Sequence, residues 1–158
     1  MIAHPSNATG PLTVQIVEGL YADALVLADE ARAAFDGSAP QSLRAAARPA
    51  AVALSIEGLR TTTRIMHILA WLLNQRAYMA GELNERQLRL HGALPKDRAS
   101  DPEQLALLDG RTRELIVETE RLHARIARLD ELQRQDAGAD MEDAPVHLLH
   151  RKLRSAFG

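Results

Sequence analysis

The sequence predicts an all-α protein: an antiparallel three-helix bundle of long, heptad-patterned helices with a flexible C-terminal tail. Apolar residues recur at alternating spacings of three and four along three stretches of the chain. Residues that end or begin helices separate these stretches, among them Asp36-Gly37, Gly81 and Asp101-Pro102. No strand-like alternation competes with the helical spacing.

The composition is that of one globular domain. The chain has 158 residues, of which 46% are hydrophobic and 25% charged, so it can bury a core. Its formal net charge is −2, which gives no basic surplus for holding a phosphate backbone. It has no cysteine, which excludes disulfides, thiolate metal sites and cysteine nucleophiles. We expect no signal peptide, because no charged segment followed by an apolar one begins the chain.

The first helix is expected over residues 12–36, after a disordered N-terminus at residues 1–11. Asp36-Gly37 ends this helix, and a proline-containing linker follows. The helix has one apolar seam, which comprises Val17, Leu20, Ala24, Leu27, Ala31 and Ala34.

The second helix is expected over residues 50–80, with Gly81 as its left-handed cap. Its sequence contains IMHILAWLL, residues 65–73, which is too short for a membrane span of roughly 20 apolar residues. An unbroken 4-3-4-3 pattern predicts the seam that faces the bundle core: Val52, Ile56, Leu59, Thr63, Met66, Ala70, Leu73, Ala77 and Ala80.

A second apolar stripe remains on this helix. Ile65, Ile68 and Leu72 lie about 130° round from the seam, farther than two bundle neighbours should cover. We predict that these three residues form a homodimer interface. The alternative is that the linker at residues 37–49 or the C-terminal segment folds over them.

A loop with one helical turn at residues 85–90 is expected before the third helix. That helix is predicted over residues 102–135, with Asp101 as its cap and Pro102 at its first position. Its seam comprises Leu105, Leu108, Thr112, Leu115, Thr119, Leu122, Ile126 and Leu129.

Residues 137–158 are predicted to form a flexible tail. Its first part is acidic and non-periodic, and a short amphipathic segment at residues 146–157 follows. The segment either docks on the bundle or binds a partner, and both interpretations remain open. If it binds a partner, we predict that the contacts are made by Leu148, Leu149, Leu153 and Phe157.

Few residues have the types and spacings that catalysis or metal binding requires. Glu120 and His123 match the Glu-x-x-His spacing of di-iron bundles, but such a site needs two copies of the motif, so a surface ion-pair face is expected. His147 and His150 are two ligands in a flexible tail, which make a weak metal site. No nucleophile elbow and no phosphate loop is present. The sequence therefore predicts a non-enzyme without metal or cofactor.

Charged residues are expected on solvated faces. Arg60 and Arg64 lie together on the second helix, with Arg76 well round from them, and solvated charge is the default interpretation. The third helix mixes both signs of charge along its surface.

Two stretches of the chain and its end resemble one protein family. LYADALVLADEARAAFD at residues 20–36 and IEGLRTTTRIMHILAWLLNQRAYMAGEL at residues 56–83 resemble the alphaproteobacterial regulator of CtrA degradation, the RcdA family. PVHLLHRKLRSAFG, residues 145–158, is similar to the end of that family. The resemblance covers the first two helices and the tail.

This resemblance implies a homodimer of three-helix bundles that acts as a non-enzymatic adaptor. Such an adaptor delivers substrates, among them the cell-cycle regulator CtrA, to the ClpXP protease in regulated proteolysis. The implied partners are a CpdR-like response regulator that primes the protease, a PopA-like adaptor and the protein substrates. The implied location is cytoplasmic, including the cell pole, and no cofactor is implied.

The alternative function is a helical dimeric regulator that binds nucleic acid or a transcription component. The sequence pI near 6.3, the lack of a basic stripe and the lack of a helix-turn-helix signal argue against it.

Overall fold

The computed structural model describes residues 12–36 and 48–142. Their helices are α1 (Val14–Phe35), α3 (Arg48–Met79), α4 (Glu85–His91), α5 (Pro102–Ala106) and α6 (Gly110–Glu142). The described residues contain no strand, which confirms the all-α class. No described helix is long and apolar enough to cross a membrane. The predicted disordered N-terminus and the amphipathic tail segment lie outside the described residues.

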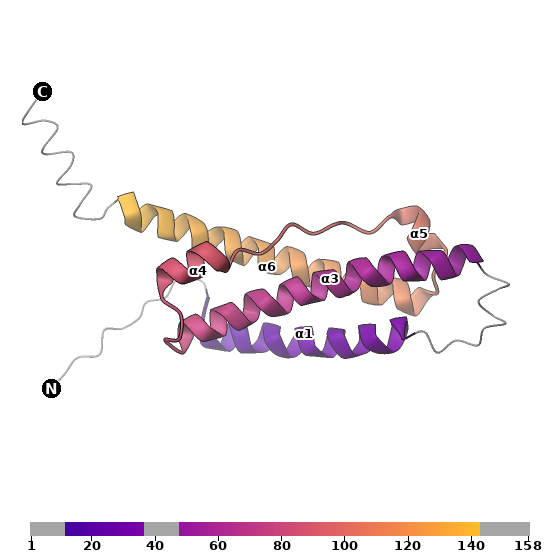
Figure 1. Ribbon diagram of the computed structural model, residues 1–158, viewed down its shortest axis with the longest axis horizontal. Coiled ribbons are helices and arrows are strands. Elements are labelled where there is room, and N and C mark those ends of the chain that lie inside the picture. The colour runs from indigo at the N-terminus through magenta and orange to yellow at the C-terminus, as the bar shows by residue number, and fades with distance from the viewer. Residues whose placement is uncertain (1–11, 37–47, 143–158) are drawn as a thin grey trace, which may run out of the picture.

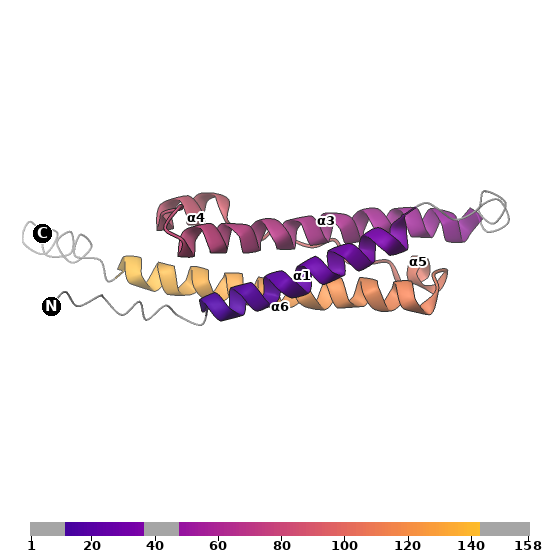
Figure 2. The same ribbon diagram turned by 90° about the horizontal axis from the view of Figure 1, so that it is seen from below.

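The three long helices α1, α3 and α6 form the bundle, and α1 lies across the other two (Figures 1 and 2). α1 is antiparallel to α3, as predicted. Near one end of the pair Glu18 of α1 is ion-paired with Arg76 of α3, and near the other end Phe35 packs on Gly58. An added Cβ at Gly58 would lie 2.9 Å from the Phe35 ring, so glycine allows this close approach.

α6 is parallel to α3, so the antiparallel order predicted for the three helices is wrong at this helix. The contacts between the two helices advance in the same direction along both. Arg64 contacts Thr119, Trp71 contacts Asp130, and Gln75 contacts Gln133. The chain therefore has to return along the length of the bundle before α6 begins (Figure 1).

The return is made by residues 92–101, here called the strap, which follow α4 and lead into α5. The strap has no regular secondary structure, so its backbone polar groups need partners elsewhere. Several of them bond side chains of α3 and α6, as described below. The sequence predicts a loop here, but it does not predict the path of this loop along the bundle.

The third predicted helix is divided in two. Asp109 precedes α6, and its carboxylate accepts hydrogen bonds from the backbone N–H and the hydroxyl of Thr112 at 2.9 and 2.8 Å. These bonds, the backbone one first, lower the pKa of Asp109. A new helix therefore starts at residue 110, after the short α5. α6 then continues to Glu142, so the predicted helix end near residue 135 and the tail start at residue 137 are wrong.

Most of the predicted helix ends are confirmed, and so are the apolar seams predicted for the first and third helices. Asp101 accepts from the N–H of Glu103, and Pro102 begins α5. Gly81 has φ +79° after α3, where a left-handed cap was expected. The single helical turn predicted at residues 85–90 is α4. The predicted seams of the first and third helices are buried or half-buried. The third seam begins with Leu105 in α5 and Leu108, and its other residues lie in α6.

Candidate interaction surface

The predicted dimer residues lie inside the protein. Ile65, Ile68 and Leu72 have 5%, 0% and 0% of their surface exposed, and they pack against α1 and α6 within a single copy. They are therefore core residues, and the predicted homodimer interface at these positions is wrong.

The predicted core seam of α3 lies on the surface instead. Val52, Ile56, Leu59, Met66 and Leu73 are between 37% and 70% exposed. Thr63 and Ala70 between them are exposed as well. We call the set Val52, Ile56, Leu59, Thr63, Met66, Ala70, Leu73 and Ala77 the outer stripe.

α3 thus has two faces with the same spacing. Ala53 and Leu72 are fully buried. Beside them, six residues that are at most 2% exposed mark the inner face of the helix: Glu57, Thr61, Arg64, Ile68, Trp71 and Gln75. They also recur at intervals of four and three, so periodicity cannot distinguish this inner face from the outer stripe. Four of these six residues are polar, so the outer stripe is the more uniformly apolar of the two faces. The apolar pattern therefore predicts the outer stripe as the core seam. Glu57, Arg64 and Gln75 have hydrogen-bond partners in the strap and α6, and Glu57 also bonds Arg60 of α3.

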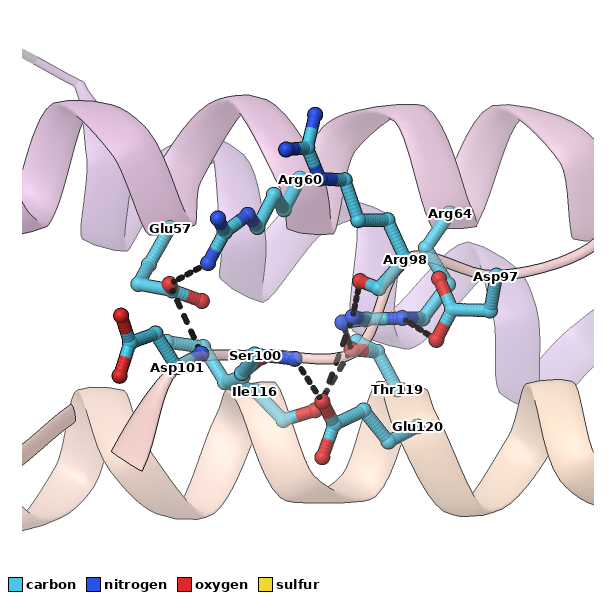
Figure 3. A network of polar contacts seen from close by, with 10 residues as sticks. All are labelled: Glu57, Arg60, Arg64, Asp97, Arg98, Ser100, Asp101, Ile116, Thr119 and Glu120. Atoms are coloured by element: carbon cyan, nitrogen blue, oxygen red, sulfur yellow. Dashed lines mark hydrogen bonds and ion pairs between the residues drawn. The ribbon is translucent and has the colours of Figure 1, made fainter. Parts of the chain in front are cut away.

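Arg64 is the centre of the inner face (Figure 3). Its guanidinium donates to the Asp97 carboxylate at 2.7 Å, to the Thr119 hydroxyl at 2.9 Å and to the backbone carbonyl of Arg98 at 3.2 Å. It also lies 3.4 Å from Glu120. Arg64 was expected to be solvated, but its side chain is fully buried. It joins α3, the strap and α6.

Two carboxylates fasten the end of the strap (Figure 3). Glu120 accepts from the backbone N–H of Ser100 at 2.9 Å. Glu57, which is fully buried, accepts from the N–H of Asp101 at 3.3 Å and from Arg60 at 2.6 Å. These bonds are made by Glu120 Oε1 and Glu57 Oε1, and they anchor the strap. Arg60 compensates the charge of Glu57, and Arg64 lies against both Asp97 and Glu120.

Three oxygens of this region have no hydrogen-bond partner and are buried: Glu57 Oε2, Thr61 Oγ1 and Ser100 Oγ. Thr61 follows Glu57 by one helical turn, and Ser100 precedes Asp101, which bonds Glu57. Buried polar atoms of this kind in native proteins are commonly satisfied by ordered water.

A second set of polar contacts joins the C-terminal half of α3 to α6. The indole N–H of Trp71 donates to Asp130 at 2.8 Å, and the amides of Gln75 and Gln133 bond each other at 2.9 and 3.1 Å. Asp130 also accepts from the N–H of Leu94 in the strap at 3.4 Å. These bonds fix the parallel register of the two helices.

Glu120 and His123 do not form a surface ion-pair face. Glu120 takes part in the Arg64 cluster, and His123 is buried with Nε2 3.1 Å from the carbonyl oxygen of Pro95. Among the residues that the structure describes, no group of three or more His, Cys, Asp or Glu side chains could hold a metal ion. Glu120 and His123 instead hold the strap on α6, through Ser100 and Pro95 respectively.

An open groove of about 440 Å³ runs between α1 and α3 beside the outer stripe. Its lining is mainly apolar and includes Ala28 and Phe35 of α1 and Ile65, Met66 and Leu69 of α3. Met66 belongs both to this groove and to the outer stripe, so the two form one continuous apolar surface.

The predicted partner contacts Leu148, Leu149, Leu153 and Phe157 lie outside the described residues, as do His147 and His150. The sequence reasoning missed the strap contacts of Asp97, Arg98 and Ser100, because nothing in a single sequence shows which loop meets which helix. It also missed the inner face, although Glu57, Thr61 and Arg64 at helical spacing gave a signal for it.

A family model described as "Protein of unknown function (DUF1465)" matches residues 10–157. No curated protein matches the chain. No solved structure matches it either.

Proposed function

The chain belongs to the DUF1465 family, and we propose that it acts as a non-enzymatic adaptor that delivers substrate proteins to the ClpXP protease. The observation that supports a protein-binding role best is the outer stripe. Five large apolar side chains are exposed on one face of a 32-residue helix, beside an apolar groove. Continuous exposed apolar surface of this kind commonly marks a site of contact with another protein.

The finer parts of the proposal come from the resemblance to the RcdA family. It supplies CtrA as the type of substrate, and a CpdR-like response regulator and a PopA-like adaptor as partners. It also supplies a homodimer as the working form and the cytoplasm, including the cell pole, as the place of action. The chain itself needs no cofactor in this role.

The C-terminal segment supplies the partner contacts in this proposal. Val146, Leu149, Leu153 and Phe157 form the apolar side of the amphipathic pattern at residues 146–157. The predicted contacts are Leu148, Leu149, Leu153 and Phe157. A tethered apolar segment gives weak, reversible contacts, because ordering it on binding costs free energy. Weak contacts suit an adaptor that must release its cargo to the protease.

A reconstituted degradation assay tests the proposal. It contains ClpXP, the response regulator, the PopA-like adaptor and CtrA, with either the intact chain or a chain that ends at Glu142, where α6 ends. We expect the truncated chain to melt at an unchanged temperature and to lose delivery of CtrA. The double substitution Leu149→Asp and Leu153→Asp should reproduce the loss in the full-length chain, and Ser155→Asp is the matched control.

Two results would count against this function. CtrA degradation that proceeds equally well when the chain is left out altogether would rule out the adaptor role in this system. Delivery that is unchanged by the truncation would leave the adaptor role but remove the tail from it.

A further inference from the structure

The outer stripe has the spacing of a coiled-coil seam. From Val52 to Ala77 its residues alternate at intervals of four and three, which is the spacing that keeps one face of a helix against a partner helix. The inner face of α3 already meets α1, α6 and the strap. Among residues 12–36 and 48–142, the outer stripe therefore has a pairing pattern that no other helix uses.

We propose that two copies of the chain associate through their outer stripes, with the two α3 helices antiparallel and Ile56 of one copy facing Leu73 of the second. This inference rests on the homodimer included in the proposed function and assigns its interface. It replaces the interface predicted from Ile65, Ile68 and Leu72, which are buried.

The side chains of the stripe complement one another in this register. Leu59 faces Ala70 of the second copy, and Val52 faces Ala77, so a large residue meets a small one in each of these layers. Thr63 and Met66 meet on either side of the two-fold axis. A shift of one heptad in either direction would place Val52 or Leu73 at the end of the partner helix, beyond its stripe.

Charge favours the antiparallel arrangement only slightly. The sides of the stripe carry Arg60 and Arg76, and each is ion-paired within its own copy, with Glu57 at 2.6 Å and with Glu18 of α1 at 2.7 Å. The like-charge contribution to the choice of arrangement is therefore small. A parallel pair would bring Arg60 level with Arg60 of the second copy, and Arg76 level with Arg76. In the antiparallel pair Arg60 comes level with Leu69 and Arg76 with Ala53, so like charges are separated.

The area indicates an interface of modest strength. The large stripe residues span about 32 Å of helix, from Val52 to Leu73. A standard interface buries about 800 Å² on each partner, which is more than one helix face provides. The α1–α3 groove beside Met66 adjoins the stripe and adds apolar area. We expect a dimer with a dissociation constant on the order of micromolar.

The arrangement has a consequence for the adaptor role. α6 is parallel to α3, and both helices end at the same end of the bundle (Figure 1). Antiparallel pairing of the α3 helices therefore places the Glu142 ends of the two copies at opposite ends of the dimer. The two C-terminal segments would start far apart, so that each could engage a partner separately.

Cysteine cross-linking tests the register directly, because the chain has no cysteine of its own. The full-length variants Ile56→Cys and Leu73→Cys are oxidised separately and as an equal mixture. We expect a disulfide-linked dimer in the mixture and none with either variant alone. In this register two copies of the same residue are about 26 Å apart along the helix, whereas a disulfide needs Cα atoms within about 7 Å.

Sedimentation equilibrium tests the surface. Leu59→Asp should raise the dimer dissociation constant at least about tenfold, with an unchanged circular dichroism spectrum. Leu132→Asp, at an exposed position of α6, is the matched control and should leave it unchanged.

The proposed register is overturned if either cysteine variant cross-links with itself as well as in the mixture. The interface is overturned if the unaltered chain is monomeric at about 100 μM, or if Leu59→Asp leaves dimerisation unchanged. A monomeric chain that still delivers CtrA would overturn the interface alone. A dimer that cross-links as expected but delivers nothing would overturn the adaptor function alone.

Discussion

At the scale of single residues, Arg64 carries the largest set of contacts between separate elements. Its buried guanidinium bonds side chains and a backbone carbonyl from the strap and α6. A buried charge of this kind is tolerated because Asp97 and Glu120 compensate it. Its removal would leave Thr119 and the Arg98 carbonyl without this donor and both carboxylates without their counter-charge.

We therefore predict that Arg64→Met lowers the free energy of unfolding by about 3 kcal/mol, at the low end for a broken buried pair because both carboxylates keep some exposure. Urea denaturation monitored by circular dichroism measures the loss. Arg121→Met is the matched control, because Arg121 and Glu118 form an exposed pair, worth at most about 1 kcal/mol. Equal losses for the two variants would show that the Arg64 cluster does not stabilise the fold.

At the scale of elements, the two faces of α3 exchange the roles that the apolar pattern predicted for them. Both faces have heptad spacing, and the outer stripe is the more uniformly apolar one. The inner face is nevertheless buried, because the strap, α6 and Arg60 supply partners for Arg64, Gln75 and Glu57. The polar groups of the inner face are thereby compatible with burial.

Two substitutions on neighbouring positions distinguish the faces. Ile68→Asp buries a carboxylate at a position with no exposed surface, so we expect the domain to unfold at room temperature. Met66→Asp replaces a residue that is 64% exposed, and the isolated domain should keep its helicity with a change within about 0.5 kcal/mol in unfolding free energy. Thermal melting at a concentration where the chain is monomeric provides the comparison. A folded Ile68→Asp domain would contradict the assignment of the inner face.

At the scale of the whole molecule, the direction of α6 is the main difference from the predicted bundle. A short connection would have made α6 antiparallel to α3. The strap instead carries the chain back along the bundle, and its bonds at Leu94, Pro95, Asp97 and Ser100 distribute the attachment over its length. The parallel order also decides that α3 and α6 end together.

Spin-label distances test this order. A label at Ala80, just after α3, should lie close to one at Asp136 near the end of α6. A label at Arg113 near the start of α6 should be farther from Ala80, since 23 residues of helix separate the two α6 positions by about 35 Å. The labelled chain is diluted with unlabelled chain to remove distances between copies. The reverse order of distances would show an antiparallel α6.

The sequence by itself determined the helical class, most helix ends and the buried seams of α1 and α6, because spacing and capping are local properties. Gly81 and Asp101 act at the helix ends where their residue types predict. Only the tertiary structure decided which face of α3 is buried and which way α6 runs. Both depend on contacts between residues more than 30 positions apart, such as Arg64 with Asp97 and Trp71 with Asp130. A pattern that repeats on both sides of a helix cannot say where those partners lie.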